Sequence, residues 1–391
     1  MNLRVPPVPT QTQGRPPVDW AAFRSCFPTL ERIVYLDTAR KALLPRWIEA
    51  AMRGYMADIY ETAGRLAFSM DEIEAARRDL AAFVGADADT VALIKNTSEG
   101  LNIIAHALQL GPGDNVVISP LEHENNTLPW QYLLRHGVEL RIAEPGPDGT
   151  VPPACYEPLI DANTRLVSLA WVAYGTGYRA DVPAVAALAR RHGARIAVDA
   201  IQAVGILDCR VDALDADFVV SGGHKTLLST TGAGFMHVRP ALADDLPPPF
   251  AAKHGFAAAD RTALMLQPAD GARRFEYGNP NFLGIWLQRR SMQELLGIGL
   301  PQIEARVRHL TTLLIDALDA AGLTVRTPRD WGRRAGIVSM ETRQPAADVV
   351  ARLAELGIVV SAKDGLLRAS VHAYNDEADI ARFVAALTRL A

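Results

Sequence analysis

The stretch from residue 194 to residue 236 carries the side chains whose types and spacing best suit catalysis. It contains two mainly apolar segments, residues 194–198 and 217–220, which we expect to be buried strands. The first segment runs into Asp199, and the second is followed shortly by Lys225. Because α/β sheets bind ligands outside the carboxyl ends of their strands, this carboxylate and this lysine can face one pocket. Pyridoxal phosphate (PLP) requires a lysine amine for its Schiff base and an acid beside its pyridinium nitrogen.

Taken singly, these residues have ordinary explanations. An aspartate at a strand end often caps a turn or a helix, and a lone lysine is usually solvated. The order of the motifs changes this balance, since D-A-x-Q at 199–202 is followed by S-G-G-H-K at 221–225 and T-G-A-G at 231–234. This series resembles the class V aminotransferase and cysteine desulfurase family of fold-type I PLP enzymes, which includes selenocysteine lyase-like members. The resemblance extends from about Tyr35 to the C-terminus.

Composition excludes several other classes of protein. The 391 residues have a formal net charge of −4, which gives no electrostatic reason to bind nucleic acid or an anionic membrane. No apolar run approaches the roughly 18 residues of a membrane span. The Pro-rich N-terminus lacks the apolar core of a signal peptide. The three cysteines have neither disulfide-framework nor metal-ligand spacing, so we expect no metal and a reducing cytoplasm.

The alternation of apolar strands and amphipathic helices predicts an α/β protein built from βαβ units around a mostly parallel sheet. The resemblance implies a seven-stranded sheet of the fold-type I kind, with flanking helices and a smaller α+β C-terminal domain. We expect an N-terminal arm over 1–31 that packs with the small domain, a large PLP-binding domain over 32–290 and the small domain over 291–391. A capping box of Ser69 and Glu72 is expected to begin a helix near residue 70.

A phosphate site is predicted where the strand at 90–94 leads into a helix beginning at Asn96, Thr97 and Ser98. Free backbone N–H groups and the helix dipole favour an anion at such a terminus. The alternative is that Thr97 and Ser98 merely cap the helix.

The resemblance implies roles for further residues around the cofactor. Lys225 forms the Schiff base, Asp199 holds the pyridine nitrogen protonated, and His123 in E-H-x-x-N stacks on the ring. Contacts with the phosphate or the phenolic oxygen are implied for Thr97, Ser98, Gln202, Ser221, His224 and Asn279. In homodimers of this fold the segment around Asn279 reaches the PLP phosphate of the neighbouring subunit, so a homodimer is expected.

On the substrate side, Arg368 lies in R-x-S-x-x-x-Y-N, and its paired donors suit the carboxylate of an amino acid. A surface arginine at a strand end is the alternative. Ala39 belongs to Y-L-D-x-A, which lines the substrate side of the pocket in the family. Tyr174 stands where the family commonly has an asparagine near the phenolic oxygen, and we expect it to contact the substrate or cofactor.

Desulfurases of this group carry a mobile loop whose cysteine accepts the substrate sulfur, and this chain has a short Lys363-Asp364-Gly365 turn there instead. We therefore predict an enzyme that acts on an amino acid or amino-acid conjugate through an external aldimine, either as an aminotransferase or as a C–S or β-elimination lyase. The alternatives are an amino-acid racemase or epimerase, and a cysteine desulfurase or selenocysteine lyase that uses no loop cysteine. A non-catalytic PLP-binding protein is a third possibility, which the intact set of Lys225, Asp199 and His123 argues against.

Overall fold

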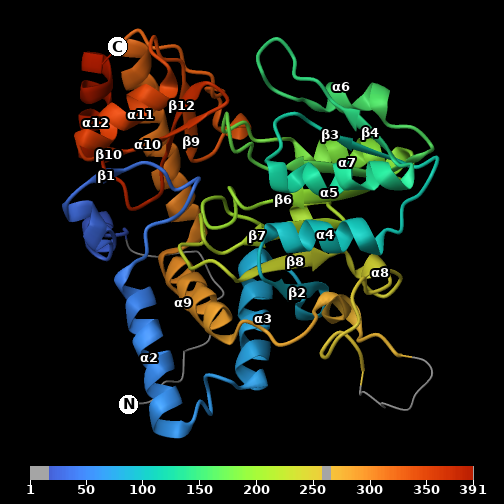
Figure 1. Cartoon of the computed structure of the whole chain (residues 1–391). Coiled ribbons are helices and arrows are strands. Elements are labelled where there is room, and N and C mark those ends of the chain that lie inside the picture. The colour runs from blue at the N-terminus through green and yellow to red at the C-terminus, as the bar shows by residue number, and fades with distance from the viewer. Residues whose placement is uncertain (1–16, 258–265, 391) are drawn as a thin grey trace.

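A seven-stranded sheet forms the centre of the chain (Figure 1). The computed structural model describes residues 17–257 and 266–390, so residues 1–16 of the expected arm lie outside the described part. The strand order is β2-β8-β7-β6-β5-β3-β4, and β8 alone runs antiparallel to its neighbours. The strands are β2 (Val91–Ile94), β3 (Asn115–Ile118), β4 (Glu139–Ile142), β5 (Thr164–Ala170), β6 (Arg195–Asp199), β7 (Phe218–Gly222) and β8 (Gly234–Val238). The predicted mostly parallel sheet is confirmed.

Helices cover both faces of this sheet because its central strands are apolar on both sides. Successive residues of a strand point to opposite faces. Val198 and Val219 accordingly join one core with α7, whereas Ala197 and Val220 join another core with α4. The helices of this part are α2 (Arg46–Thr62), α3 (Met70–Val84), α4 (Thr97–Ala107), α5 (Leu128–Tyr132), α6 (Pro153–Tyr156), α7 (Val182–Arg191), α8 (Pro240–Ala243) and α9 (Phe282–Ile298).

The C-terminal part has its own smaller sheet and core. Its elements are α10 (Leu300–Ala320), β9 (Ile337–Met340), α11 (Ala346–Glu355), β10 (Ile358–Val359), β11 (Ser361–Lys363), β12 (Leu366–Ser370) and α12 (Glu377–Leu390). Strands β11, β12 and β9 form an antiparallel sheet, and β1 (Val34–Tyr35) pairs in parallel with β10. Helix α1 (Trp20–Ser25) joins the same region, since Arg24 pairs with Asp379 of α12.

The expected boundary between the two domains, at residue 290, lies inside α9. The long helical region breaks at Gly299, whose φ of 107° separates α9 from α10. The first half of α10 packs into the core of the large sheet through Ile303, and its second half packs into the small core through Leu314. Helix α10 thus joins the two cores.

The predicted capping box does not form. Ser69 occupies the N-cap position of α3, but its side chain makes no capping hydrogen bond. Glu72 pairs instead with Arg289 of α9, at 2.7 Å, so a contact between helices replaces the local one.

Two further features concern possible partners. No helix within the described residues is long and apolar enough to cross a membrane. The same residues contain no group of three or more His, Cys, Asp or Glu side chains placed to hold a metal ion.

Candidate active site

A cavity of about 240 Å³ lies at one edge of the large sheet. Strands β2, β3, β5, β6 and β7 run in the same direction, so their carboxyl ends meet at this edge. The predicted site residues that line the cavity are Ala39, Thr97, Ser98, His123, Tyr174, Asp199, His224, Lys225 and Arg368. The fold therefore brings these predicted residues together, although Ala39 and Arg368 are 329 positions apart in the sequence.

Lys225 and Asp199 both line this cavity. Asp199 is the last residue of β6 and is 5% exposed, and its Oδ1 accepts a hydrogen bond from the backbone N–H of Ile201 at 3.0 Å. Burial lowers the pKa of Lys225 to about 8, while the nearby carboxylate of Asp199 opposes this shift. Burial raises the pKa of Asp199, and the charge of Lys225 opposes that shift in turn. Each group therefore favours the charged form of the other.

The N-terminus of α4 forms another wall. Asn96 is the N-cap, since its Oδ1 accepts a hydrogen bond from the N–H of Glu99 at 2.9 Å. Thr97 is therefore not needed as a cap, and its buried Oγ1 has no hydrogen-bond partner among the described residues. An unpaired buried hydroxyl costs about 1–3 kcal/mol. A helix N-terminus with a free hydroxyl, beside Ser98 and His224, fits the phosphate of PLP.

His123 and His224 are both held in their neutral form. Burial and the charge of Lys225 lower the pKa of His123. The same two causes lower the pKa of His224 to about 4. The ring of His123 meets the ring of Tyr174 edge to face, with centroids 4.9 Å apart. His123 thus presents an uncharged imidazole, which can stack on an aromatic ring.

Arg368 is 1% exposed and is fixed by three contacts. Its Nη2 pairs with Asp37 at 3.1 Å, its Nη1 donates to the carbonyl of Tyr174 at 2.8 Å, and its Nε donates to Ser361 at 3.0 Å. A guanidinium has five N–H donors. One N–H therefore remains on each of Nη1 and Nη2, which is the paired arrangement that a carboxylate accepts.

Three predicted residues do not line the cavity. The amide of Gln202 donates to the carbonyl of Ala39 at 2.9 Å, so it supports the substrate wall. Ser221 is fully buried within β7, and its hydroxyl donates to the carbonyl of Gly222 at 3.3 Å.

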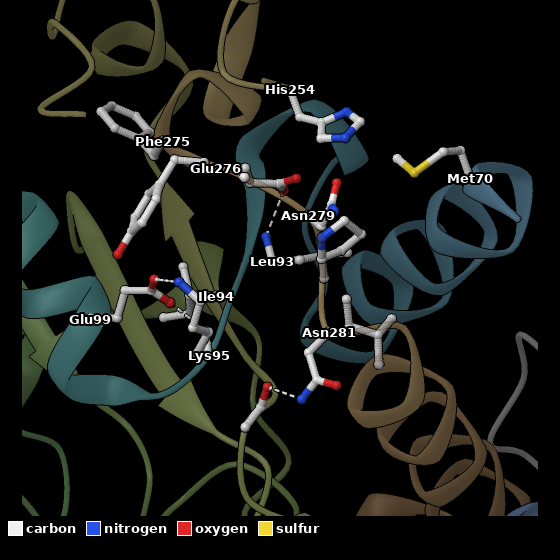
Figure 2. A pocket seen from close by; sticks show the side chains of 15 residues that line it. Met70, Leu93, Ile94, Lys95, Glu99, His254, Phe275, Glu276, Asn279 and Asn281 are labelled. Carbon is white, nitrogen blue, oxygen red and sulfur yellow. Dashed lines mark hydrogen bonds and ion pairs between the residues drawn. The ribbon is translucent and has the colours of Figure 1, made fainter. Parts of the chain in front are cut away.

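The third, Asn279, lies in a separate pocket between β2 and the start of α9 (Figure 2). Its segment is held on both sides, because Glu276 accepts a hydrogen bond from the N–H of Leu93 at 2.7 Å and Asn281 donates to the carbonyl of Gly232 at 2.7 Å. Asn279 itself is exposed, and its expected role at the site of a neighbouring subunit stays a prediction.

Comparison with known proteins places this chain in a family. The aminotransferase class-V model matches residues 34–383. The cysteine desulfurase of Salmonella gallinarum is 31% identical, over 94% of this chain and 97% of that protein. The chain belongs to the aminotransferase class-V family. The predicted family, and with it the expectation of a PLP-dependent enzyme of the transferase or lyase kind, are confirmed.

Solved structures of class-V proteins share the whole architecture. A cysteine desulfurase from Thermococcus onnurineus NA1 has a TM-score of 0.86 at 26% identity, covering 95% of this chain and 97% of that one. A cysteine desulfurase from Escherichia coli has a TM-score of 0.86 at 25% identity, covering 96% and 98%. The expected fold-type I architecture is therefore confirmed.

Within this class-V fold, β11 and β12 form a tight hairpin beside the cavity. Lys363 faces Leu366 across it, and the two residues of the turn, Asp364 and Gly365, have φ of 51° and 79°. Two successive left-handed residues are typical of a type I′ turn. None of the three cysteines, which are all free, lines the cavity of this chain.

Sequence reasoning missed several residues of the site. Asp37 lies in the quoted Y-L-D-x-A motif, but its pairing with Arg368 was not foreseen. The cavity residues to which the sequence assigned no individual role are Arg40, Asn96, Asn125, Ile201 and Lys363. Asn96 carried a usable signal, because asparagine directly before a helix is a preferred N-cap.

Proposed function

We propose that this chain is a PLP-dependent enzyme that acts on an α-amino acid by transamination or by β-elimination such as C–S bond cleavage. The observation that carries the proposal is the meeting of Lys225, Asp199 and the free hydroxyl of Thr97 in one cavity. When bound, the cofactor supplies an electron sink for the bonds at the substrate α-carbon. The chain's own residues must hold the reactants and move the protons.

The cofactor is held at three places. The N–H groups of α4 and the hydroxyls of Thr97 and Ser98 would bind the phosphate. The carboxylate of Asp199 would keep the pyridine nitrogen protonated, and the ring of His123 would stack on the cofactor ring.

The substrate carboxylate binds the two free N–H groups of Arg368, and this contact fixes the orientation of the α-carbon. The amine of Lys225 then moves a proton at that carbon. Its pKa of about 8 suits this exchange, since a proton shuttle works best when its pKa lies near the pH of the reaction.

The β11–β12 hairpin favours these reactions over desulfuration. In this chain a cation, Lys363, lines the cavity at the hairpin, and no thiol lies there to accept sulfur. The relatives' name, cysteine desulfurase, supports a second candidate that would use a cysteine from elsewhere. Turnover that survives replacement of Cys26, Cys155 and Cys209 by serine would exclude that candidate. The three free thiols also suit a reducing compartment, and we propose the cytoplasm.

We also propose a homodimer with active sites completed across the interface. Tyr60 and Phe68, near the end of α2 and the start of α3, are 81% and 52% exposed. Large apolar side chains at the surface are typical of interfaces. Sedimentation velocity at micromolar concentration tests this proposal, which a monomer would contradict.

The function is tested by adding a panel of amino acids to the PLP-loaded protein and recording its visible spectrum. We expect at least one amino acid to change the absorbance, and Lys225→Ala to abolish turnover. Release of a keto acid, ammonia and thiol without an acceptor would identify the lyase. Conversion of the cofactor to its amine form, reversed by a keto acid, would identify the aminotransferase. Full activity in Lys225→Ala would disprove the proposal.

A further inference from the structure

Lys363 is a charged cavity residue to which the proposed reaction assigns no role. It is the last residue of β11, it is half-buried, and it lines the cavity together with Arg368. Residues directly opposite each other on an antiparallel pair share a face, as do residues two positions apart on one strand. Ser361 lies opposite Arg368, and Lys363 is two positions beyond Ser361. All three side chains therefore stand on the face of the hairpin that meets the cavity.

Among the described residues, the charge of Lys363 has no partner in an ion pair. Its Nζ lies 5.8 Å from the centroid of the Tyr174 ring. Asp364 follows it in the chain, but that carboxylate turns toward the Tyr174 hydroxyl at 3.5 Å. The other cationic groups at the substrate wall are engaged, because Asp37 pairs with both Arg368 and Arg40.

The small sheet that contains this hairpin is joined to the loop after β5 by contacts from β9, which pairs with β12, and from the segment before β9. Thr327 donates a hydrogen bond to the carbonyl of Thr176 at 2.6 Å, and Ser339 donates to the carbonyl of Gly175. A Cβ on Gly175 would lie 3.0 Å from the carboxylate of Asp364, so the approach is close. Lys363 is thus presented to the cavity from a fixed backbone, although its side chain remains free to reach for a ligand.

We propose that Lys363 binds an acidic group at the end of the substrate side chain. The substrate class is then an α-amino acid with a second anionic group, such as a carboxylate or a sulfinate. This inference rests on the proposed function, in which Arg368 takes the α-carboxylate and the N-terminus of α4 takes the cofactor phosphate. Two residues of strand span about 7 Å. Lys363 is therefore displaced from Arg368, which binds the α-carboxylate, by about the length of an amino-acid side chain. An acidic group at the end of the substrate side chain would lie near Lys363.

The test compares acids with their neutral counterparts on the PLP-loaded protein. Dissociation constants for aspartate and asparagine, for glutamate and glutamine, and for cysteine sulfinate and cysteine are measured from the visible spectrum. A charge-assisted hydrogen bond contributes about 1.5–3 kcal/mol. We therefore expect each acid to bind roughly tenfold or more tightly than its neutral counterpart. Lys363→Met should reduce this ratio to about one, because the acids lose their charged partner.

Two further variants make the outcome decisive. Lys363→Arg keeps the charge and should keep the preference. Arg352→Met removes one positive charge from the exposed side of α11 in the same domain, outside the cavity, and should leave the ratio unchanged. Equal affinity for acids and neutral amino acids in the unmodified protein, or an unchanged ratio in Lys363→Met, would overturn the inference while the proposed function stands. If no amino acid of either kind changes the spectrum, both fall.

Discussion

Lys225 illustrates how burial prepares one amine for chemistry at neutral pH. An amine must lose its proton before it can attack the aldehyde of PLP, and an exposed lysine does so only near pH 10.4. The cavity removes water from around Lys225, which disfavours its charged form and lowers its pKa to about 8. The carboxylate of Asp199 acts in the opposite direction. The pKa is thus a balance between desolvation and one nearby charge.

This balance predicts how fast the cofactor-free protein takes up PLP at different pH values. The rate should rise with pH through a midpoint near 8 and level off above it, because the neutral fraction of Lys225 is then complete. Asp199→Asn removes the charge that favours protonated Lys225, so the midpoint should move to lower pH. Stopped-flow absorbance provides the measurement. A midpoint above 10 would show that the amine is solvated, and an unmoved midpoint in Asp199→Asn would remove the coupling.

Site residues that lie in short sequence motifs could be predicted from the sequence. Contacts between residues that are far apart in the sequence could not. Lys225, Asp199 and His123 each lie in a short motif, and the order of these motifs could be read directly. The pairing of Asp37 with Arg368 joins positions that are 331 residues apart. Only folding brings such a pair together. Lys363 was read only as part of a turn, because its direction depends on the register of the hairpin.

At the scale of elements, we expect α4 to be the helix on which cofactor binding depends most. Its cap is Asn96, and this leaves Thr97 free to face the cavity. We expect Asn96→Ala to lower the free energy of unfolding by about 1 kcal/mol, as loss of an N-cap usually does. Cofactor retention should also weaken, because we propose that the first N–H groups of α4 bind the phosphate. Urea denaturation and the dissociation constant for PLP are the two measurements.

Helix α7 offers the matched control for this prediction. Asp181 caps α7 by accepting a hydrogen bond from the N–H of Ala184 at 3.2 Å, and it does not line the cavity. Asp181→Ala should therefore cost a similar free energy of unfolding without weakening PLP binding. If both variants lose PLP equally, general destabilisation explains the loss and the special role of α4 is wrong.

Most elements could be predicted because their apolar residues follow a strand or helix period. The exceptions have identifiable causes. Strand β4 was not foreseen, since its four residues, Glu139 to Ile142, are largely polar or exposed at the edge of the sheet. Residues 358–363 form two short strands, not one continuous strand, because β10 pairs with β1 while β11 pairs with β12. In both cases the pairing with another strand decides which residues form a strand. The local sequence does not show which strands will pair.

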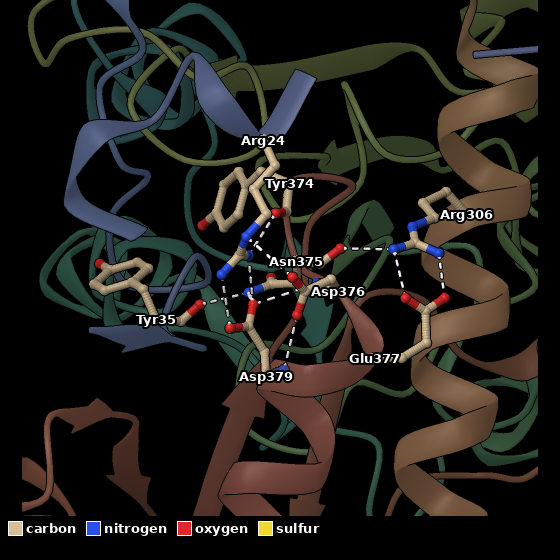
Figure 3. A network of polar contacts seen from close by, with 8 residues as sticks. All are labelled: Arg24, Tyr35, Arg306, Tyr374, Asn375, Asp376, Glu377 and Asp379. Atoms are coloured by element: carbon tan, nitrogen blue, oxygen red, sulfur yellow. Dashed lines mark hydrogen bonds and ion pairs between the residues drawn. The ribbon is translucent and has the colours of Figure 1, made fainter. Parts of the chain in front are cut away.

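At the scale of the whole molecule, a polar network joins the two ends of the described chain (Figure 3). Arg24 of α1 makes a bidentate contact with Asp379 of α12, at 2.7 and 2.9 Å, and donates to the carbonyl of Tyr374 at 2.9 Å. Asn375 donates to the carbonyl of Tyr35 at 2.9 Å, which ties the start of the substrate wall to the same network. The N-terminal segment is therefore bound to the C-terminal part by directional contacts, in addition to apolar packing.

This network predicts that Arg24 stabilises the whole fold. Arg24→Ala leaves Asp379, which is 3% exposed, without its cation, so we expect the free energy of unfolding to fall by about 2–4 kcal/mol. Adding Asp379→Asn removes the unpaired charge and should recover part of this loss, because the double variant no longer buries a carboxylate alone. Arg53→Ala breaks only an exposed pair with Glu49 and should cost less than about 1 kcal/mol. Urea denaturation of the four proteins distinguishes these cases. If Arg24→Ala and Arg53→Ala lower the free energy of unfolding by equally small amounts, packing alone fixes α1 against α12. Loss of a buried ion pair would leave a buried charge without its partner, and that would cost more.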